Sequence, residues 1–259
     1  DYFTVNDSNN KNIKTSVLPK QLLGQSVTYG LTKVNGEVKY ITPSGYVATN
    51  SFLKDASGNW YYVNADGNFI TAPTTINGRE YFFPNNGINL RDALVKNTDG
   101  SLSYYQANGV KAKNAGYYIS PNVDRAIYID ESGSVHTGAL KISKTYQYFD
   151  ANGHQIKGNM VTVDGKKKYF APGSGNIVRN SFFSFNNNWY YANSYGNVVT
   201  GKYKIKGKYY YFYRNGVQNK GHFVVNKNYM LSYYNAKNGQ SVKHSFRNKG
   251  HRLTVSRYG

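Results

Sequence analysis

The feature that most constrains this chain is a short unit that repeats along most of its length. Each unit has a polar or glycine turn, a short aromatic strand, a second turn that ends in glycine, and a β-branched strand, as at 58–67, 146–153 and 207–216. The glycines that end the second turn, here called the turn glycines, lie at 45, 67, 87, 109, 133, 153, 175, 196, 216 and 239. Their spacing of 20 to 24 residues is typical of folds in which neighbouring repeats bury each other.

Each unit is predicted to be a β-hairpin, because Asp-Gly and Asn-Gly pairs accept the positive φ of tight turns between aromatic and β-branched strands. One two-stranded hairpin is marginal alone, so neighbours must stack. We therefore predict an all-β fold, a β-solenoid of about ten stacked hairpins of roughly 21 residues. Residues 1–30 are a degenerate lead-in, 31–246 are the repeats and 247–259 are a cap or tail. The stretch 89–96 is expected to be a strand despite its weak helical signal.

Composition narrows the setting of this fold. The chain has 27 Tyr and no Cys, so its core must be built from rings in thin layers, and neither disulfides nor thiolate metal sites can form. No run approaches the roughly 18 apolar residues of a membrane span, and no signal segment opens the chain. Since it begins at Asp1 without Met, we expect a piece of a longer, exported protein.

The net charge of +19 is concentrated in the C-terminal half. Residues 1–130 have 12 Lys or Arg and 10 Asp or Glu, whereas residues 131–259 have 20 and three. Such a basic half attracts polyanions in general, so nucleic acid, teichoic acid and anionic membrane all fit the charge.

The repeats resemble cell-wall-binding and glucan-binding repeats. Residues 75–83 and 86–94 look most like the glucan-binding domain of a glucansucrase of glycoside hydrolase family 70, a secreted enzyme that builds α-glucan from sucrose. The resemblance covers about residues 31–246. It implies a β-solenoid with shallow sugar pockets and no catalytic residues, and a secreted, cell-surface location.

A sugar pocket of this family is similar to a trio of a ring, a Gln two places after the turn glycine, and a Lys from the next hairpin. Two repeats of this chain fit that pattern, and the expected residues are Tyr148 with Gln155 and Lys166 or Lys167, and Tyr211 with Gln218 and Lys227. We expect the pocket edge at Gln155 to face solvent. Other repeats depart from the pattern, since Asn89 stands at the Gln position after Gly87.

The choline-binding branch of these repeats uses a Gly-Trp step, because rings that box a quaternary ammonium group attract it by cation–π interaction. Here Ala139, Asn159, Lys202 and His222 follow the corresponding glycines, and the chain has two Trp residues. The sequence therefore argues against choline boxes.

Catalysis is also disfavoured. A glycosidase needs two carboxylates across the scissile bond, and here Asp66, Asp99, Asp150 and Asp164 are expected to serve turns. The five His residues lack metal-ligand spacing. We expect no catalytic residue, no metal and no cofactor.

The chief basic features are the run Lys166 to Lys168 and a set of alternate lysines, Lys202, Lys204, Lys206 and Lys208. If one strand carries these four, they form a strip on one face that can bind a polyanion; alternatively they only keep a Tyr-rich surface soluble. No nucleic-acid-binding signature appears.

These observations predict a monomeric binding module for neutral α-glucan, whose basic half helps attachment to an anionic cell-wall polymer, with neither nucleic acid nor membrane insertion. The alternatives are a wall anchor without glucan specificity and a spacer that projects a catalytic domain.

Overall fold

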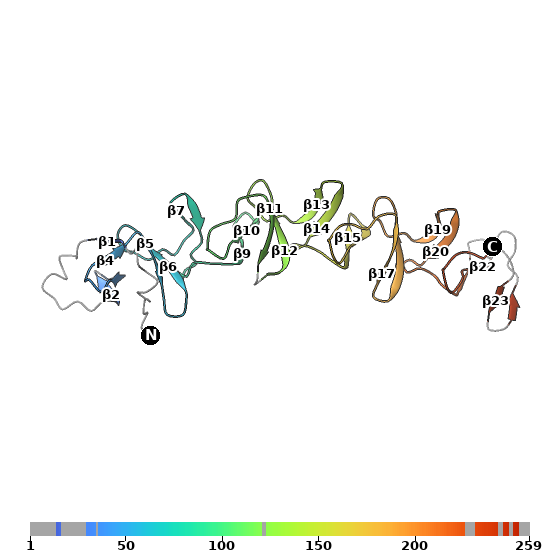
Figure 1. Cartoon of the computed structure of the whole chain (residues 1–259), viewed down its shortest axis with the longest axis horizontal. Coiled ribbons are helices and arrows are strands. Elements are labelled where there is room, and N and C mark those ends of the chain that lie inside the picture. The colour runs from blue at the N-terminus through green and yellow to red at the C-terminus, as the bar shows by residue number, and fades with distance from the viewer. Residues whose placement is uncertain are drawn as a thin grey trace. The chain divides into compact units, whose positions relative to one another are not determined.

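The computed structural model describes residues 14–16, 30–34, 36–120, 123–225, 231–242, 246–248 and 251–253. They belong to two compact units, Asp1–His136 and Thr137–Gly259, each described by itself below. Within the described ranges the regular structure is all strand, as Figure 1 shows by arrows without coiled ribbons. The all-β prediction is confirmed. The described residues include no helix that is long and apolar enough to cross a membrane.

The described residues of unit 1 form a four-stranded antiparallel sheet in the order β1-β4-β3-β2, followed by four two-stranded hairpins. The strands of the sheet are β1 (Lys14–Ser16), β2 (Gly30–Val34), β3 (Glu37–Ile41) and β4 (Val47–Thr49). The hairpin strands are β5 (Ser51–Lys54), β6 (Trp60–Val63), β7 (Thr74–Ile76), β8 (Arg79–Tyr81), β9 (Ala93–Lys96), β10 (Leu102–Tyr105), β11 (Gly116–Ser120) and β12 (Val123–Ile129). β9 confirms a strand in the second half of the stretch 89–96.

Unit 2 consists of six antiparallel hairpins in chain order. Their strands are β13 (Gly138–Ile142), β14 (Thr145–Phe149), β15 (Asn159–Val163), β16 (Lys166–Phe170), β17 (Ser181–Phe185), β18 (Asn188–Ala192), β19 (Gly201–Ile205), β20 (Lys208–Phe212), β21 (Phe223–Val225), β22 (Leu231–Tyr233), β23 (Phe246–Asn248) and β24 (His251–Leu253).

Strand alternation decides which rings are core. In β20, Tyr210 and Phe212 are buried, whereas Tyr209 and Tyr211 on the opposite face are partly exposed. This division follows from the two-residue period of a strand. One face of each aromatic strand therefore builds the core and leaves the other face available for contacts outside it.

The turns use their polar residues as predicted. Asp164 and Gly165 have φ values of 49° and 70°, the left-handed region that a two-residue hairpin turn requires. In the second type of turn, Asp150 Oδ1 accepts hydrogen bonds from the N–H groups of Asn152 and His154, both at 2.9 Å. The Asp150 carboxylate therefore stabilises the local backbone.

Backbone hydrogen bonds join successive repeats within each unit. The residue two positions after a turn glycine donates its backbone N–H to a carbonyl in the aromatic strand of the previous repeat. In unit 2 these pairs are Ile177 to Tyr146, Val198 to Lys167, Gln218 to Trp189 and Ser241 to Tyr209, and in unit 1 they are Asn89 to Trp60, Lys111 to Glu80 and Val135 to Leu102, at 2.7 to 2.8 Å. Each repeat therefore satisfies polar groups of its predecessor.

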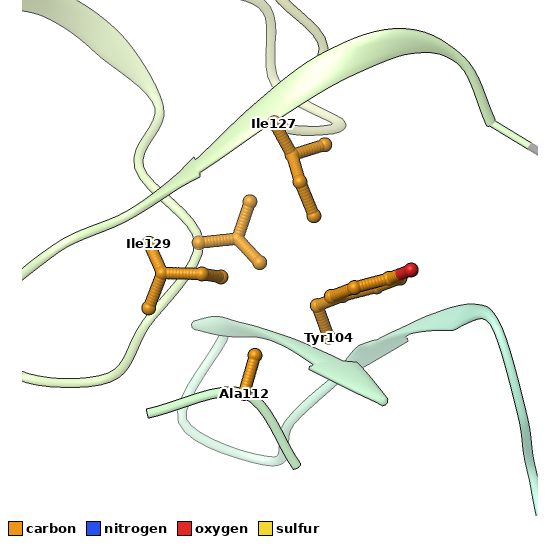
Figure 2. Close-up of a cluster of buried hydrophobic side chains, with 5 residues drawn as sticks. Tyr104, Ala112, Ile127 and Ile129 are labelled. Carbon is orange, nitrogen blue, oxygen red and sulfur yellow. The ribbon is translucent and has the colours of Figure 1, made fainter. Parts of the chain in front are cut away.

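The cores are small clusters, each made by neighbouring repeats. Figure 2 shows Tyr104 of β10, Ala112, and Ile127 and Ile129 of β12 converging in one cluster, to which Val135 also belongs. In unit 2 the rings of Tyr169 and Phe183 stack at 4.3 Å with an interplanar angle of 5°. This thin, ring-rich packing agrees with the composition, because a hairpin can bury its rings only against the adjacent hairpin.

Candidate functional site

The partly exposed rings of β14 form one wall of a cavity in unit 2. Tyr146 and Tyr148 lie on one face of β14, and Gln147 and Phe149 on the other face are buried. Tyr146 is 37% exposed. Tyr148 is half-buried, and its ring packs against Phe170 of the next hairpin with centroids 5.8 Å apart. This packing fixes the orientation of the Tyr148 ring.

The cavity has a volume of about 460 Å³ and is built by three successive repeats of unit 2. The hairpin β13–β14 supplies rings, β16 supplies Lys168 and Phe170, and the turn after β18 supplies polar groups. Its lining residues are Ala139, Tyr146, Gln147, Tyr148, Val163, Asp164, Lys168, Phe170, Ile177, Arg179, Ser194, Tyr195 and Asn197. Tyrosine rings beside amide, hydroxyl and charged groups match the surface of a sugar ring, which has apolar C–H faces and a polar edge.

Lys168 connects the wall of the cavity to the next repeat. Its Nζ donates to the Tyr195 carbonyl at 3.1 Å and to Asn197 Oδ1 at 2.6 Å. Burial lowers the pKa of Lys168, and the nearby positive charge of Arg179 lowers it further. Lys168 is therefore a fixed, partly desolvated cation in the wall of the cavity.

Arg179 lies over an aromatic ring in a register that other repeats share. Its guanidinium carbon is 5.2 Å from the centroid of the Tyr146 ring. The corresponding pairs in other repeats are Arg91 over Trp60 at 4.7 Å and Lys220 over Trp189 at 5.0 Å. In each pair the cation stands four residues after a turn glycine. The residue two positions before the cation donates its backbone N–H to the carbonyl of the ring residue. One face of these rings is therefore covered by a cation of the protein itself.

The first predicted trio is partly brought together. Tyr148 lines the cavity. Gln155 is 3% exposed, and its Nε2 donates to Gln147 Oε1 and, at 3.4 Å, to the Ser174 carbonyl. The expectation that the pocket edge at Gln155 faces solvent is therefore wrong: the amide packs against Gly175, the turn glycine of the next repeat. Lys166 and Lys167 are exposed and are not among the lining residues.

The second predicted trio shows the same burial of the amide. Tyr211 packs against Tyr234 with centroids 5.8 Å apart, and burial, together with the neighbouring Tyr211, raises the pKa of Tyr234 to about 12. Gln218 is 7% exposed and donates to the Asn238 carbonyl at 3.2 Å. Lys227 lies outside the described residues.

Of the 13 residues that line the cavity, the predicted site residues include Tyr148, and those missed include Tyr146, Lys168, Arg179 and Tyr195. The alternation of β16 could have pointed to Lys168, because it shares a face with Phe170, which packs against Tyr148. No local pattern identifies Tyr195, which is 75% exposed and comes from a turn two repeats away from β14.

The predicted lysine strip is interrupted. β19 ends at Ile205, Lys206 has a φ of 45° in the turn, and Lys208 starts β20 opposite Ile205. Lys202 and Lys204 remain on one face, 4.9 and 5.7 Å from the Tyr209 ring centroid, while Lys208 lies on the other face. The expectation of four lysines on one continuous strand is therefore wrong, although Lys202 and Lys204 do form a paired basic surface.

Several of the described carboxylates have structural partners. Glu80 forms ion pairs with Lys113 at 2.6 Å and Lys111 at 3.5 Å, and Asp130 accepts from the N–H groups of Ser132 and Ser134. Within the described ranges no group of three His, Asp or Glu side chains is placed to hold a metal ion.

The chain is similar to families of repeat proteins and to bacterial glucosyltransferases. Residues 136–182 and 199–246 match the family described as choline-binding repeat, and residues 50–69 match the putative cell wall binding repeat. The chain is 38% identical over 88% of its length to glucosyltransferase-S of Streptococcus mutans, and 37% identical over 92% to glucosyltransferase-I of the same species.

Residues 50–69, 136–182 and 199–246 are thus cell-wall-binding and choline-binding repeats. The chain is homologous to the glucan-binding region of the Streptococcus glucosyltransferases, and it spans 16% of the length of both S. mutans relatives. The glucan-binding resemblance seen in residues 75–94 is thereby confirmed.

Solved structures show the same fold. Choline binding protein F of Streptococcus pneumoniae has a TM-score of 0.62 at 20% identity, covering 90% of this chain and 91% of that one. The modular autolysin LytC of the same species has a TM-score of 0.58 at 15% identity, covering 86% of this chain and 50% of that one. At this identity the similarity speaks for the fold of repeated hairpins alone.

Proposed function

We propose that this chain is a non-catalytic carbohydrate-binding module that holds α-glucan of the dextran type for a larger secreted glucansucrase. The observation that carries the proposal is the 38% identity to glucosyltransferase-S over 88% of the chain, against only 16% of that relative. A repeat region of this size beside a much longer enzyme fits a binding role, and the carboxylates of the described residues serve turns and ion pairs.

The cavity of unit 2 is the proposed glucan site. Tyr148, held by Phe170, offers a ring for the C–H face of a glucose unit, and Tyr146 extends that surface. Asn197 supplies an amide for sugar hydroxyls, whereas Gln147 is buried and bonded to Asn176 and Gln155 and holds the wall of the cavity. Gln155, buried behind Gly175, supports the site through its bond to Gln147. We propose Tyr211 as the ring of a second site with Gln218 in the supporting position; a role of Lys166, Lys167 or Lys227 in contacting glucan stays a prediction.

The proposed arrangement of the repeats is a β-solenoid of about ten hairpins. The hydrogen bonds from the residue two places after each turn glycine to the preceding hairpin support this reading within each unit. We further propose a secreted, cell-surface protein, because the relatives are bacterial glucosyltransferases and the repeats match cell-wall-binding families.

Dextran retention tests the glucan site. The full chain should be retarded on a dextran affinity gel. In a Tyr211→Ala background, which removes the proposed second site, Tyr148→Ala should weaken retention strongly, whereas Tyr148→Phe keeps the ring and should bind nearly as well as Tyr148. Tyr117→Ala is the matched control, because Tyr117 is 45% exposed and lies in unit 1. Equal retention in that background with and without Tyr148→Ala, at unchanged melting temperatures, would show that the cavity is not the site.

The family match makes choline the alternative ligand to examine. We propose that choline does not bind at Trp60, Tyr146 or Trp189, because Arg91, Arg179 and Lys220 already cover one face of these rings. A quaternary ammonium group would have to displace a cation that the protein tethers beside the ring. Titration with choline followed by Trp fluorescence should give no saturable change; a saturable change would favour a choline-dependent wall anchor.

The basic surface of unit 2 is proposed to help attachment to an anionic wall polymer. Lys202 and Lys204 over Tyr209 are the described residues that best support it, and Lys206 and Lys208 add charge nearby. The rivals are a wall anchor without glucan specificity and a spacer. Binding to purified wall polymer but not to dextran would favour the anchor, and binding to neither would favour the spacer.

A further inference from the structure

The cavity of unit 2 carries more positive charge than a neutral sugar requires. Its lining includes two cations, Lys168 and Arg179, and one carboxylate, Asp164. No ion pair within 4 Å joins Lys168 or Arg179 to a carboxylate in the described part of the chain. Two like charges that share one cavity repel each other, and the pKa of Lys168 is lowered first by burial and then by Arg179.

Lys39 makes the same contact with a following turn as Lys168 does, but its charge is neutralised by a carboxylate. Lys39 of β3 donates to the Asp66 carbonyl at 2.7 Å and to Asn68 Oδ1, the same two positions around a turn glycine that Lys168 bonds around Gly196. Lys39 also pairs with Glu37 at 2.9 Å. The residue two positions before Lys168 is Lys166, whereas the residue two positions before Lys39 is this glutamate. The structural contact therefore does not require an unpaired charge. At Lys168 no carboxylate forms an ion pair with the ammonium group in the described part of the chain, and the charge of Asp164, which tends to raise the pKa of Lys168, offsets only part of the lowering by burial and Arg179.

Gln147 shows that the contact does not require a cation at all. It occupies the corresponding position of β14, and its Nε2 donates to Asn176 Oδ1 at 2.9 Å and to the Ser174 carbonyl at 3.4 Å. An amide thus connects one hairpin to the next turn as a lysine does. If bridging repeats were the only role of Lys168, a glutamine would serve there, without the cost of burying a cation beside Arg179.

Both cations have donors left for a ligand. An ammonium group has three N–H donors, and Lys168 directs two of them at Tyr195 and Asn197. Arg179 lies over Tyr146, which holds the guanidinium in place at the rim formed by the β14 rings. A ligand that stacks on these rings would therefore bring its substituents next to two fixed positive charges.

We propose that this cavity binds a saccharide that bears an anionic substituent, a phosphate or a carboxylate, with the sugar ring on Tyr146 and Tyr148 and the anion between Lys168 and Arg179. The inference rests on the proposed sugar-binding role of the same cavity. Charge-assisted hydrogen bonds from ammonium and guanidinium groups favour such an anion over a neutral hydroxyl.

Calorimetric titration of the full chain at 0.1 M salt tests this. The probes are isomaltotriose, isomaltotriose phosphorylated at its terminal 6-position, the same trisaccharide with a terminal glucuronate, and inorganic phosphate. We expect at least one charged trisaccharide to bind about tenfold more tightly than the neutral one, as charge-assisted hydrogen bonds allow. The phosphorylated and uronate forms show which anion the cavity prefers.

Matched variants assign the effect to the two cations. Lys168→Gln removes the charge but keeps an amide that can bridge to the next turn as Gln147 does, and Arg179→Gln removes the second cation. Both should abolish the preference for the charged trisaccharide, measured as the ratio of its affinity to that of the neutral trisaccharide for the same variant. Lys144→Gln, an exposed lysine in the turn of β13–β14, is the control and should change nothing.

The outcomes separate this inference from the proposed function. Equal binding of neutral and charged trisaccharides overturns the anion preference and leaves glucan binding standing. No binding of any trisaccharide overturns both. Inorganic phosphate that binds as tightly as the charged sugars, or a preference that Lys144→Gln also removes, identifies general charge attraction and overturns the proposed site.

Discussion

Single residues decide how one repeat recognises the next. The residue type at the position four residues after a turn glycine varies with the side chain that this position faces in the preceding hairpin. Arg91, Arg179 and Lys220 face rings, and Lys113 faces Glu80 in an ion pair. In the repeat with turn glycine Gly196, the corresponding residue of the preceding hairpin is Lys167, and the position four residues after the glycine is Thr200. No second cation therefore stands opposite this lysine. We interpret these pairs as contacts between repeats that also occupy ring faces.

Lys220 offers a clean test of such a contact. Lys220→Met keeps the apolar stem but removes the charge 5.0 Å from the Trp189 ring, and it should lower the free energy of unfolding by about 0.5 to 1 kcal/mol. A double-mutant cycle with Trp189→Leu, followed by urea unfolding, measures the coupling. Lys237→Met, at an exposed position, is the control. A coupling energy of zero would contradict the contact.

Asn219 is a second residue with a testable cost. It is fully buried, and within the described chain its Oδ1 is a buried polar side-chain atom without a hydrogen-bond partner. The residues at the same place after the turn glycines of the two preceding repeats are Val178 and Val199. Asn219→Val should therefore raise the free energy of unfolding by about 1 kcal/mol, because an unsatisfied buried polar group is removed. Thermal melting measures it, and a lower melting temperature would show that the Nδ2 bond to the His222 carbonyl matters more.

Among the rings of the candidate site, the sequence predicts Tyr148 and misses Tyr146 and Tyr195. Tyr148 follows from its register and lines the cavity as expected. Gln155 has the right register but turns inward, because its environment is set by the close approach of Gly175 from the following repeat. Lys168 and Arg179 belong to the site through contacts between repeats, which the pattern within one repeat does not encode. Long-range packing is thus the missing information.

At the scale of the element, two kinds of glycine look alike in sequence but differ in packing. Gly207 in the turn of β19–β20 and Gly216 in the following turn have φ values of 78° and 90°. A Cβ at Gly207 would meet open space, whereas one at Gly216 would lie 2.6 Å from Val198 Cγ1 and 3.3 Å from Tyr190 Cδ1. Gly216 therefore lets one repeat approach its predecessor.

This difference predicts unequal costs for the same substitution. Gly207→Ala should destabilise by about 1 to 2 kcal/mol through backbone strain alone. Gly216→Ala should cost a further 1 to 3 kcal/mol, roughly, because the methyl group overpacks a filled contact. Urea unfolding of both variants measures the difference, and equal losses would show that the turn glycines serve backbone conformation only.

The elements themselves were largely predictable. Two-residue turns such as Asp164-Gly165 mark hairpin ends by their backbone requirement. Alternation separates Tyr210 and Phe212 from Tyr209 and Tyr211, and the structure shows that the first pair is the core. The lysine strip failed for a related reason. Its alternation was real in sequence, but Lys206 and Gly207 form the turn, so that the alternate positions belong to two strands and two faces.

At the scale of the whole chain, charge and structure divide at nearly the same place. Unit 2, residues 137–259, has 20 Lys or Arg and two Asp or Glu, whereas unit 1 is almost balanced. A neutral glucan is held by stacking and hydrogen bonds, and a polyanion is held by charge. The two proposed binding modes should therefore respond differently to salt.

Binding of the full chain to dextran should change little between 0.1 M and 1 M NaCl, because stacking and sugar hydrogen bonds involve no net charge. Binding to purified teichoic acid should fall steeply over the same range, since the Debye length shrinks from about 10 Å to about 3 Å. Fragments 1–136 and 137–259, each first checked for a folded circular dichroism spectrum and cooperative melting, should differ in the same experiment. Teichoic acid binding should follow residues 137–259 almost entirely. If folded 1–136 binds teichoic acid equally well, or if salt leaves that binding unchanged, the lysines of unit 2 serve solubility and the proposed attachment to an anionic wall polymer is wrong.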